Sequence, residues 1–425
     1  MGETNGNGTR WMIAGMGTCL QLCLGTVYAW SYFQKPLVEQ YGWSHSQVAW
    51  AFSLAICFLG MAAAWGGIAL PRHGPRRLAI TGGLLFGLGY LLAALALHIR
   101  SLPLLYVGYG AIGGTGLGLG YVTPVATAVR WFPDRKGLVT GMVIMGFGFG
   151  ALLMSKVVAP LLMQATHGDL VALFAWVGLF FAVATVAVGS CLRNPPLGYA
   201  PPGMAPGGPA NVSAKEAPDA ATVRRCLLSG RFIMMWAVFF CNILAGISII
   251  SFQSPLMQDL WHRADPALSA AALAACGASL IAVSSLFNGI GRLFWGALSD
   301  RIGRVPTFRI MLGSQVAVFA ALAFVRDPWL FGGLICYILL CYGGGFGTMP
   351  SFVLDSFGGK MMPAVYGAIL TAWSAAGIAG PQLVAILKDR CGAQASTYAF
   401  VASAAVLLLG LALAFRLGPQ PDRRA

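Results

Sequence analysis

Long apolar stretches separated by short polar segments run through the whole chain. Each stretch contains about 20 or more residues, which is enough for an α-helix to cross the ~30 Å hydrocarbon core of a bilayer. The pattern predicts an all-α membrane protein with twelve transmembrane helices, at roughly 11–33, 46–70, 77–98, 102–128, 138–163, 169–192, 232–254, 268–296, 306–325, 328–352, 363–387 and 396–415.

One long segment interrupts this pattern. Residues 193–230 are rich in proline, glycine and alanine, with charges near the end, which is typical of a flexible linker. A short helix is expected near 214–228. The linker divides the chain into an N-terminal six-helix bundle, residues 1–192, and a C-terminal six-helix bundle, residues 231–425.

The two parts of the sequence contain similar segments at corresponding positions. Residues 67–76 lie between the second and third predicted helices, and residues 296–304 follow the eighth at an offset of 229. A second similarity is a proline followed seventeen residues later by a glycine, at Pro124 and Gly141 and again at Pro350 and Gly367. Parallel repeats of this kind indicate two pseudo-symmetric bundles, a construction known from secondary transporters.

Composition and charge agree with a membrane protein. The chain is 58% hydrophobic and only 9% charged, with a mean hydropathy of +0.75, which excludes an ordinary soluble protein. The net charge of +14 does not indicate a nucleic-acid partner, because the basic residues fall on alternate loops. With the N-terminus inside, the inner segments hold 19 Lys and Arg and the outer segments 6. The positive-inside rule therefore predicts cytoplasmic termini in a multi-pass protein of the plasma membrane, the inner membrane of a bacterium.

The start of the chain reads as a membrane span. The first apolar stretch follows a single basic residue, Arg10, and runs into Tyr28-Ala29-Trp30, an aromatic interface pattern, so no cleavable signal peptide is expected.

Other chemistry is not expected. Most of the ten cysteines lie in apolar stretches and the five histidines at helix ends or in loops, without metal-ligand spacing, so neither a metal nor another cofactor is predicted. No nucleophile–base pair suggests an enzyme, and no phosphate-binding loop suggests ATP as the energy source. The glycine-rich run 113–120 follows no strand and is interpreted as a site of helix packing and bending.

A single arginine inside the eighth apolar stretch is the main functional signal. An arginine at the centre of a membrane helix costs about 2.5–3.5 kcal/mol, and no acidic residue lies deep in any predicted span to neutralise Arg292. Its guanidinium fork matches a carboxylate, so the missing anion is predicted to be the substrate. Asn288, four residues earlier, shares its helical face and can add a neutral hydrogen bond. The alternative is that Arg292 reaches toward the membrane surface or bonds helix carbonyls near the glycines.

A second basic residue within a predicted span has two possible roles. Lys156 lies in the outer part of the fifth predicted helix, where it can extend toward the membrane surface or attract anions into the entrance.

The segment after Arg292 resembles a known motif. Gly-x-x-x-Asp-Arg-x-Gly-Arg resembles the inter-helix signature of the major facilitator superfamily, and its residues here are Gly296, Asp300, Arg301, Gly303 and Arg304. Gly296 is expected to let a neighbouring helix approach, and Asp300 to accept from a helix N-terminus or a basic partner. The first copy departs from the motif at Pro71, which occupies the acidic position. The alternative is that Arg301, Arg304 and Arg309 only follow the general excess of basic residues on the cytoplasmic side of the membrane.

Several further blocks are similar to the oxalate:formate antiporter and monocarboxylate porter families. They are Tyr28-Ala-Trp30 with Pro36, Gly120-Tyr121, Arg130 to Gly137, Gly146-Phe-Gly148, and Leu286 to Gly296. The resemblance implies a cage of aromatic side chains around the substrate, made of Tyr28, Tyr121, Phe147, Tyr342 and Phe346. The hydroxyls of Tyr121 and Tyr342 are expected to donate to the anion, and the two phenylalanines to wall the pocket. Ordinary packing is the alternative for each.

One position separates this chain from the oxalate transporter. That family has a second basic residue seven positions after a Tyr-Gly pair, which here is Tyr366-Gly367, and the matching residue is Trp373. A single cation balances one carboxylate, and the tryptophan adds apolar bulk. The prediction is a monomeric carrier of lactate- or pyruvate-like monocarboxylates, coupled to protons, with Asp259 as the proton-coupling candidate. An oxalate/formate-type anion exchanger is the alternative. A carboxylate sensor is disfavoured because large cytoplasmic extensions are not seen.

Overall fold

The computed structural model describes residues 3–196, 199, 220–358 and 361–418. Twelve helical segments in this part are long and apolar enough to span a membrane, which confirms the predicted number. Before the linker the elements are α1 (Glu3–Leu24), η1 (Gly25–Ala29), α2 (Trp30–Tyr41), α3 (His45–His73), α4 (Pro75–His98), α5 (Leu102–Leu105), η2 (Tyr106–Gly113), α6 (Gly114–Trp131), α7 (Lys136–Leu153), η3 (Met154–Val158), α8 (Ala159–Ala165) and α9 (Leu170–Ser190).

The linker of the sequence lies largely outside the described residues, which include only its first and last parts. The short helix expected near 214–228 is described from 220 onward, as α10. The later elements are α10 (Ala220–Leu227), α11 (Gly230–Ala264), α12 (Ala270–Ile302), α13 (Arg304–Leu322), α14 (Pro328–Phe357), α15 (Met362–Ile369), α16 (Thr371–Cys391), η5 (Gly392–Gln394) and α17 (Ala395–Arg416).

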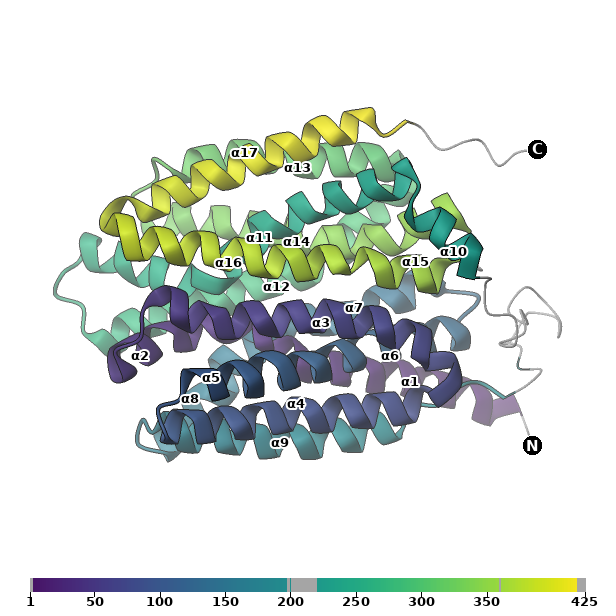
Figure 1. The fold of residues 1–425 in the computed structure, drawn as a ribbon, viewed down its shortest axis with the longest axis horizontal. Coiled ribbons are helices and arrows are strands. Elements are labelled where there is room, and N and C mark those ends of the chain that lie inside the picture. Colours follow the sequence, from purple (N-terminus) through teal and green to yellow (C-terminus); the bar gives the residue numbers. More distant parts are fainter. Residues whose placement is uncertain (1–2, 197–198, 200–219, 359–360, 419–425) are drawn as a thin grey trace.

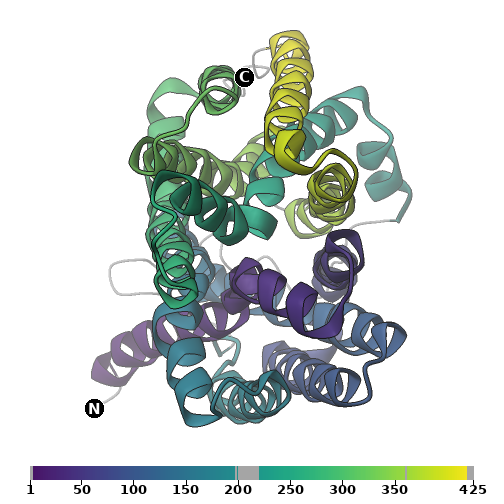
Figure 2. The same cartoon turned by 90° about the vertical axis from the view of Figure 1, so that its left-hand side faces the viewer.

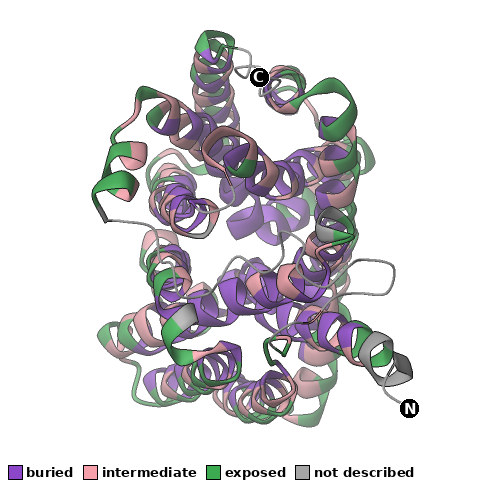
Figure 3. Ribbon diagram, turned by 90° about the vertical axis from the view of Figure 1, so that its right-hand side faces the viewer, coloured by how far each residue is buried: buried purple, intermediate pink, exposed green. Residues whose placement is uncertain are grey.

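The helices run side by side in two groups (Figure 1). Seen end-on, α1 to α9 form one group and α11 to α17 the other (Figure 2), and we call these groups the first and second halves. Buried positions concentrate where the halves face each other, while the outer surfaces are exposed (Figure 3). We call the end of the bundle where α1 begins and α17 ends the termini end. The loop after α2 and the end of α16 lie at the opposite end.

Several spans are broken rather than continuous. The first is interrupted by the tight turn η1, and the fourth and fifth contain the wide, π-type turns η2 and η3. The eleventh is interrupted by a turn at Leu370, between α15 and α16. Such irregular turns free backbone groups and redirect side chains, and they are frequent at functional sites. All four of these spans supply side chains to the site described below.

Glycines allow the halves to approach closely. Helices α7 and α12 cross where Gly148 meets Gly289, and a Cβ added to Gly148 would lie 2.6 Å from the Cα of Gly289. Within the second half, Gly291 of α12 lies against the Leu340 carbonyl of α14. The role expected for Gly296 is not supported, because a Cβ there would be 3.5 Å from the Gly347 oxygen, an ordinary contact. The close approach occurs five residues earlier, at Gly291.

The charged motif after α12 forms an ion-pair network inside the second half. Arg304 at the start of α13 bonds Asp300 at 2.6 Å and Asp355, near the end of α14, at 3.0 Å. Gly303 has a φ of +90°, a conformation that other residues adopt with strain. Arg301 is exposed. In the first half, a different pair joins α1 to the segment after α6: Arg10 contacts Asp134 at 3.2 Å.

The helix crossing at Gly148 generates a stability prediction. Gly148→Val forces a side chain against the backbone of α12, so the variant is expected to lose about 1–3 kcal/mol of stability and to unfold at a lower temperature in detergent. Gly333→Val in α14 is the matched control, because a Cβ there meets nothing within 4 Å. Equal melting temperatures for the two variants, followed by intrinsic fluorescence, would contradict the crossing.

Candidate functional site

Arg292 lies in the interior of the protein, on α12. Its side chain is 1% exposed, and its three guanidinium nitrogens have no hydrogen-bond partner among the described residues. Arg292 also takes part in none of the ion pairs found among the described residues, since no carboxylate oxygen of these residues lies within 4.0 Å of its guanidinium nitrogens. A buried cation in this condition is strongly unfavourable unless a further anion binds.

Two aromatic rings flank the guanidinium, one from each half. Its Cζ lies 5.7 Å from the ring centre of Phe147 on α7 and 5.1 Å from that of Phe346 on α14. A desolvated cation–π contact contributes about 2 kcal/mol. The rings therefore hold the cation at the seam between the halves, but they do not neutralise its charge.

Six aromatic side chains that the sequence singled out meet around this point. They form what we call the aromatic cage: Tyr28, Tyr121, Phe147, Tyr342, Phe346 and Trp373. All are at most 2% exposed. Trp373 is central, with its ring centre 4.6 Å from Phe346, 5.3 Å from Tyr121 and 5.8 Å from Phe147. The predicted convergence of these residues, from η1, α6, α7, α14 and α16, is what the structure shows.

The hydroxyl groups of the cage are not equivalent. The oxygens of Tyr28 and Tyr342 are 2.6 Å apart, so the two side chains bond each other across the halves. The Tyr121 hydroxyl has no partner at strict hydrogen-bond geometry among the described residues, but it interacts with the side chains of Arg292 and Tyr366. Of the two hydroxyls expected to donate to an anion, that of Tyr121 therefore lies beside the guanidinium. Tyr342 is already engaged, although one proton of the Tyr28–Tyr342 pair remains available.

Three further buried polar atoms in the same region have no partner at strict hydrogen-bond geometry among the described residues. They are the hydroxyl of Tyr366, the indole nitrogen of Trp373 and the side-chain oxygen of Asn288. The indole of Trp373 interacts more loosely with Tyr342. Tyr366 interacts electrostatically with Tyr121 and Arg292, which places it beside the cage. Buried polar atoms without partners are rare in proteins, since each one costs about 1–3 kcal/mol. Their grouping around one cation indicates a binding site.

Sequence reasoning missed Tyr366 as a site residue. The Tyr-Gly pair was used only to find the position that matches the second cation of the oxalate transporter, which is Trp373. Tyr366 lies in α15, four residues before the turn at Leu370 that separates α15 from α16.

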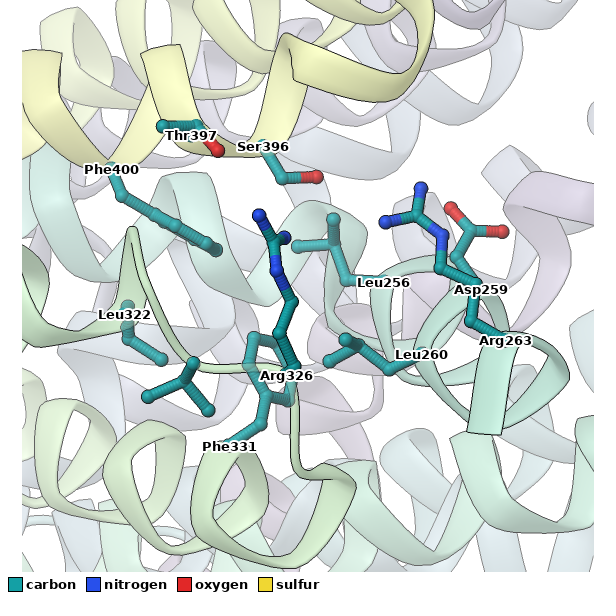
Figure 4. Close-up of a pocket in the computed structure, with 11 residues that line it drawn as sticks. Leu256, Asp259, Leu260, Arg263, Leu322, Arg326, Phe331, Ser396, Thr397 and Phe400 are labelled. Carbon is teal, nitrogen blue, oxygen red and sulfur yellow. The ribbon is translucent and has the colours of Figure 1, made fainter. Parts of the chain in front are cut away.

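Asp259 lies elsewhere. Its carboxylate pairs with Lys388 at 3.0 Å, at the end opposite the termini. It also lines a cavity between α11, α13, α14 and α17, together with Arg263 and Arg326 (Figure 4). At about 30 Å³ this cavity can hold a water molecule but not an organic acid. No described contact joins Asp259 to Arg292, so its part in proton coupling stays a prediction.

Lys156, the second basic residue of the spans, reaches across the halves. Its ammonium group donates to the hydroxyl of Ser279 on α12 at 2.7 Å. In the described residues, no group of three histidine, cysteine or acidic side chains is arranged to hold a metal ion.

Two similar groups of spanning helices with a buried cation between them define a membrane transporter. A profile of the Major Facilitator Superfamily matches residues 15–381, and the chain belongs to this family. Among solved structures, a bacterial homologue of the human lysosomal transporter Spinster, inward-facing and unoccupied, superposes with a TM-score of 0.69. It is 13% identical and covers 96% of both chains, so it supports the fold alone.

Three relatives match over nearly the whole chain. The oxalate:formate antiporter of Oxalobacter formigenes is 27% identical, covering 98% of this chain and 93% of its own. The apicoplast pyruvate carrier 1 of Toxoplasma gondii is 29% identical, covering 96% and 89%. The human monocarboxylate transporter 11 is 26% identical, covering 95% and 82%. All three names refer to carriers or transporters, and the resemblance to this branch of the family is confirmed.

The uncompensated charge at Arg292 makes a prediction about stability. Arg292→Met keeps much of the side-chain volume but removes the buried cation, so the ligand-free variant should be more stable by about 1–4 kcal/mol and melt at a higher temperature. Arg304→Met is the control, because Arg304 is paired with two carboxylates and its loss should lower the melting temperature. A lower melting temperature for Arg292→Met would show that the guanidinium has a partner inside the protein.

Proposed function

We propose that this protein carries small monocarboxylates across the membrane by alternating access, with Arg292 binding the carboxylate. The observation that supports the proposal is the buried guanidinium without a described counter-ion, together with the hydrogen-bond donors grouped around it. An arginine forms two parallel hydrogen bonds with one carboxylate, which restores both the charge balance and the hydrogen bonds.

The charge and shape of the site favour one carboxylate over two. Arg292 is the only basic side chain with a described contact to the aromatic cage, and Trp373 fills the position where the oxalate transporter has a second cation. The Tyr121 and Tyr366 hydroxyls and the indole N–H can donate to an additional oxygen at carbon 2 of the acid. These features fit lactate- or pyruvate-like anions. The alternative is oxalate/formate-type exchange, which the first-named relative performs.

Energy coupling follows from the same charge. An empty site carries a buried positive charge, whereas an occupied site is neutral, and the neutral site crosses between the two open states more easily. Substrate loading would then permit reorientation, and this accounts for either exchange or cotransport with a proton. Of the two, we propose proton cotransport, with exchange as the alternative. The distribution of basic residues supports the further proposal that the termini end faces the cytoplasm.

Uptake by purified protein in liposomes tests the proposal. Arg292→Ala and Arg292→Lys should both reduce uptake of radiolabelled lactate or pyruvate by at least about 100-fold, because the lysine retains a charge but lacks the fork. Two arms of the assay separate the coupling modes: an inwardly directed proton gradient drives accumulation in cotransport, and internal unlabelled acid accelerates uptake in exchange. Wild-type-like uptake by Arg292→Lys would contradict bidentate binding.

The selectivity of the site depends on Trp373. Trp373→Lys replaces the apolar ring by a second cation, so uptake of lactate should fall and inhibition by oxalate should become stronger. Trp373→Phe is the control, since it retains an aromatic ring without the added charge. Competition assays with both acids measure the change, and strong inhibition of the unmodified protein by oxalate would favour the exchanger alternative.

A further inference from the structure

The two halves are bonded to each other along only part of their length. The described hydrogen bonds between halves join Tyr28 to Tyr342, Cys57 to Ser374, Gly148 and Leu152 to Ser285, Lys156 to Ser279, Ser46 and Ser53 to Gln382, and His45 and Ser46 to Asp389. On α12, Ser279 and Ser285 lie farther than Arg292 from the termini end, and Gln382 and Asp389 occupy the corresponding part of α16. The bonds thus lie in the middle of the protein or toward the opposite end, where the structure is closed.

Asp389 makes the outermost of these connections. It lies in the last turn of α16, and its two carboxylate oxygens accept hydrogen bonds from the backbone N–H groups of His45, at 3.1 Å, and Ser46, at 3.0 Å. These are the first two amides of α3, in the other half. The carboxylate therefore caps a helix that belongs to a different bundle, and the partial positive charge of that helix end attracts it.

Residues of the first half also cap the start of α3, but they do not bond the amides of His45 and Ser46. Ser44 and Gln47 form a capping box, in which the Ser44 hydroxyl accepts from the Gln47 amide and the Gln47 side chain accepts from the Ser44 amide. The donors of His45 and Ser46 are outside this arrangement, and Asp389 is the acceptor that the structure describes for them. The first turn of α3 is fully capped only while the halves are together.

Asp389 differs in this respect from the other acidic residues. Among the described residues, Asp389 is the acidic residue whose side chain bonds the other half. The other described bonds of acidic side chains stay within one half: Asp134 with Arg10, Glu39 with Lys35, Asp169 with Val171, Asp259 with Lys388, Asp265 with Ala267, Asp300 and Asp355 with Arg304, and Asp327 with Leu330. The neighbouring Lys388 is held by Asp259 of α11, which fixes the last turn of α16 inside its own half.

We propose that Asp389 is a positioning residue that holds the two halves closed at the end opposite the termini. The inference rests on the proposed alternating-access function, since that mechanism requires this contact to break once in every cycle. Asp389 is exposed, so water can replace the carboxylate at the α3 amides when the halves separate. A contact of moderate strength suits a gate that must both close and open.

Hydrogen exchange on the full-length protein tests this role. In Asp389→Ala, amides in α2 and in α11, which pack against each other across the two halves, should exchange about tenfold faster, the factor that corresponds to about 1.4 kcal/mol. Asp327→Ala is the matched control: Asp327 also caps a helix at that end, by accepting from Leu330 at 2.7 Å, but within one half. The control should change exchange only at the start of α14.

The same variants separate a gate from a simple helix cap. If Asp389 only caps α3, faster exchange will be confined to the first turn of α3, and the inference is wrong. Unchanged exchange throughout would also overturn it. As a second readout, Asp389→Ala should lower the apparent KM for lactate supplied from the opposite end, because a larger fraction of the protein is open to that side. The exchange experiment needs no substrate, so it distinguishes failure of the gate from failure of the monocarboxylate proposal.

Discussion

An uncompensated positive charge in the interior organises this protein. Arg292 has no carboxylate partner in the described part of the chain, and aromatic rings from both halves flank its guanidinium. Evolution of a membrane helix normally removes such a residue, since its burial is costly without a counter-ion. Its presence at the boundary between the halves, among hydroxyl and indole groups that can donate hydrogen bonds, makes binding of an anion the simplest physical explanation for the arrangement.

The same location connects binding to movement. The cage takes side chains from both halves, and the Tyr28–Tyr342 bond joins them directly at the level of the site. A ligand held there contacts both bundles, so its presence changes the energy of their relative position. The broken spans that deliver Tyr28, Tyr121 and Tyr366 give the backbone places to bend. Closure at the opposite end is carried by separate contacts, among them the Asp389 cap.

Much of this could be predicted from the sequence, and the failures have physical causes. The lengths of the apolar stretches predicted the number of membrane spans. The lack of acidic residues deep in those spans identified Arg292 as the candidate substrate-binding residue. The resemblance to the porter families supplied the cage. Neither source could show that Tyr342 bonds Tyr28, 314 positions away, or that Asp259 is paired with Lys388. Helical periodicity places a residue on a face, but which faces meet depends on the packing of helices distant in sequence. Gly296 illustrates the limit, because its motif was present and the close contact was at Gly291.

The most direct test is a distance between Arg292 and a bound acid. Protein labelled with ¹⁵N-arginine, reconstituted in lipid and saturated with pyruvate carrying ¹³C at the carboxyl carbon, allows this distance to be measured by solid-state magnetic resonance. A bidentate contact predicts guanidinium nitrogens within about 4 Å of the labelled carbon, and loss of the signal in Arg292→Met. Bound pyruvate with no arginine nitrogen near its carboxyl carbon would contradict the account.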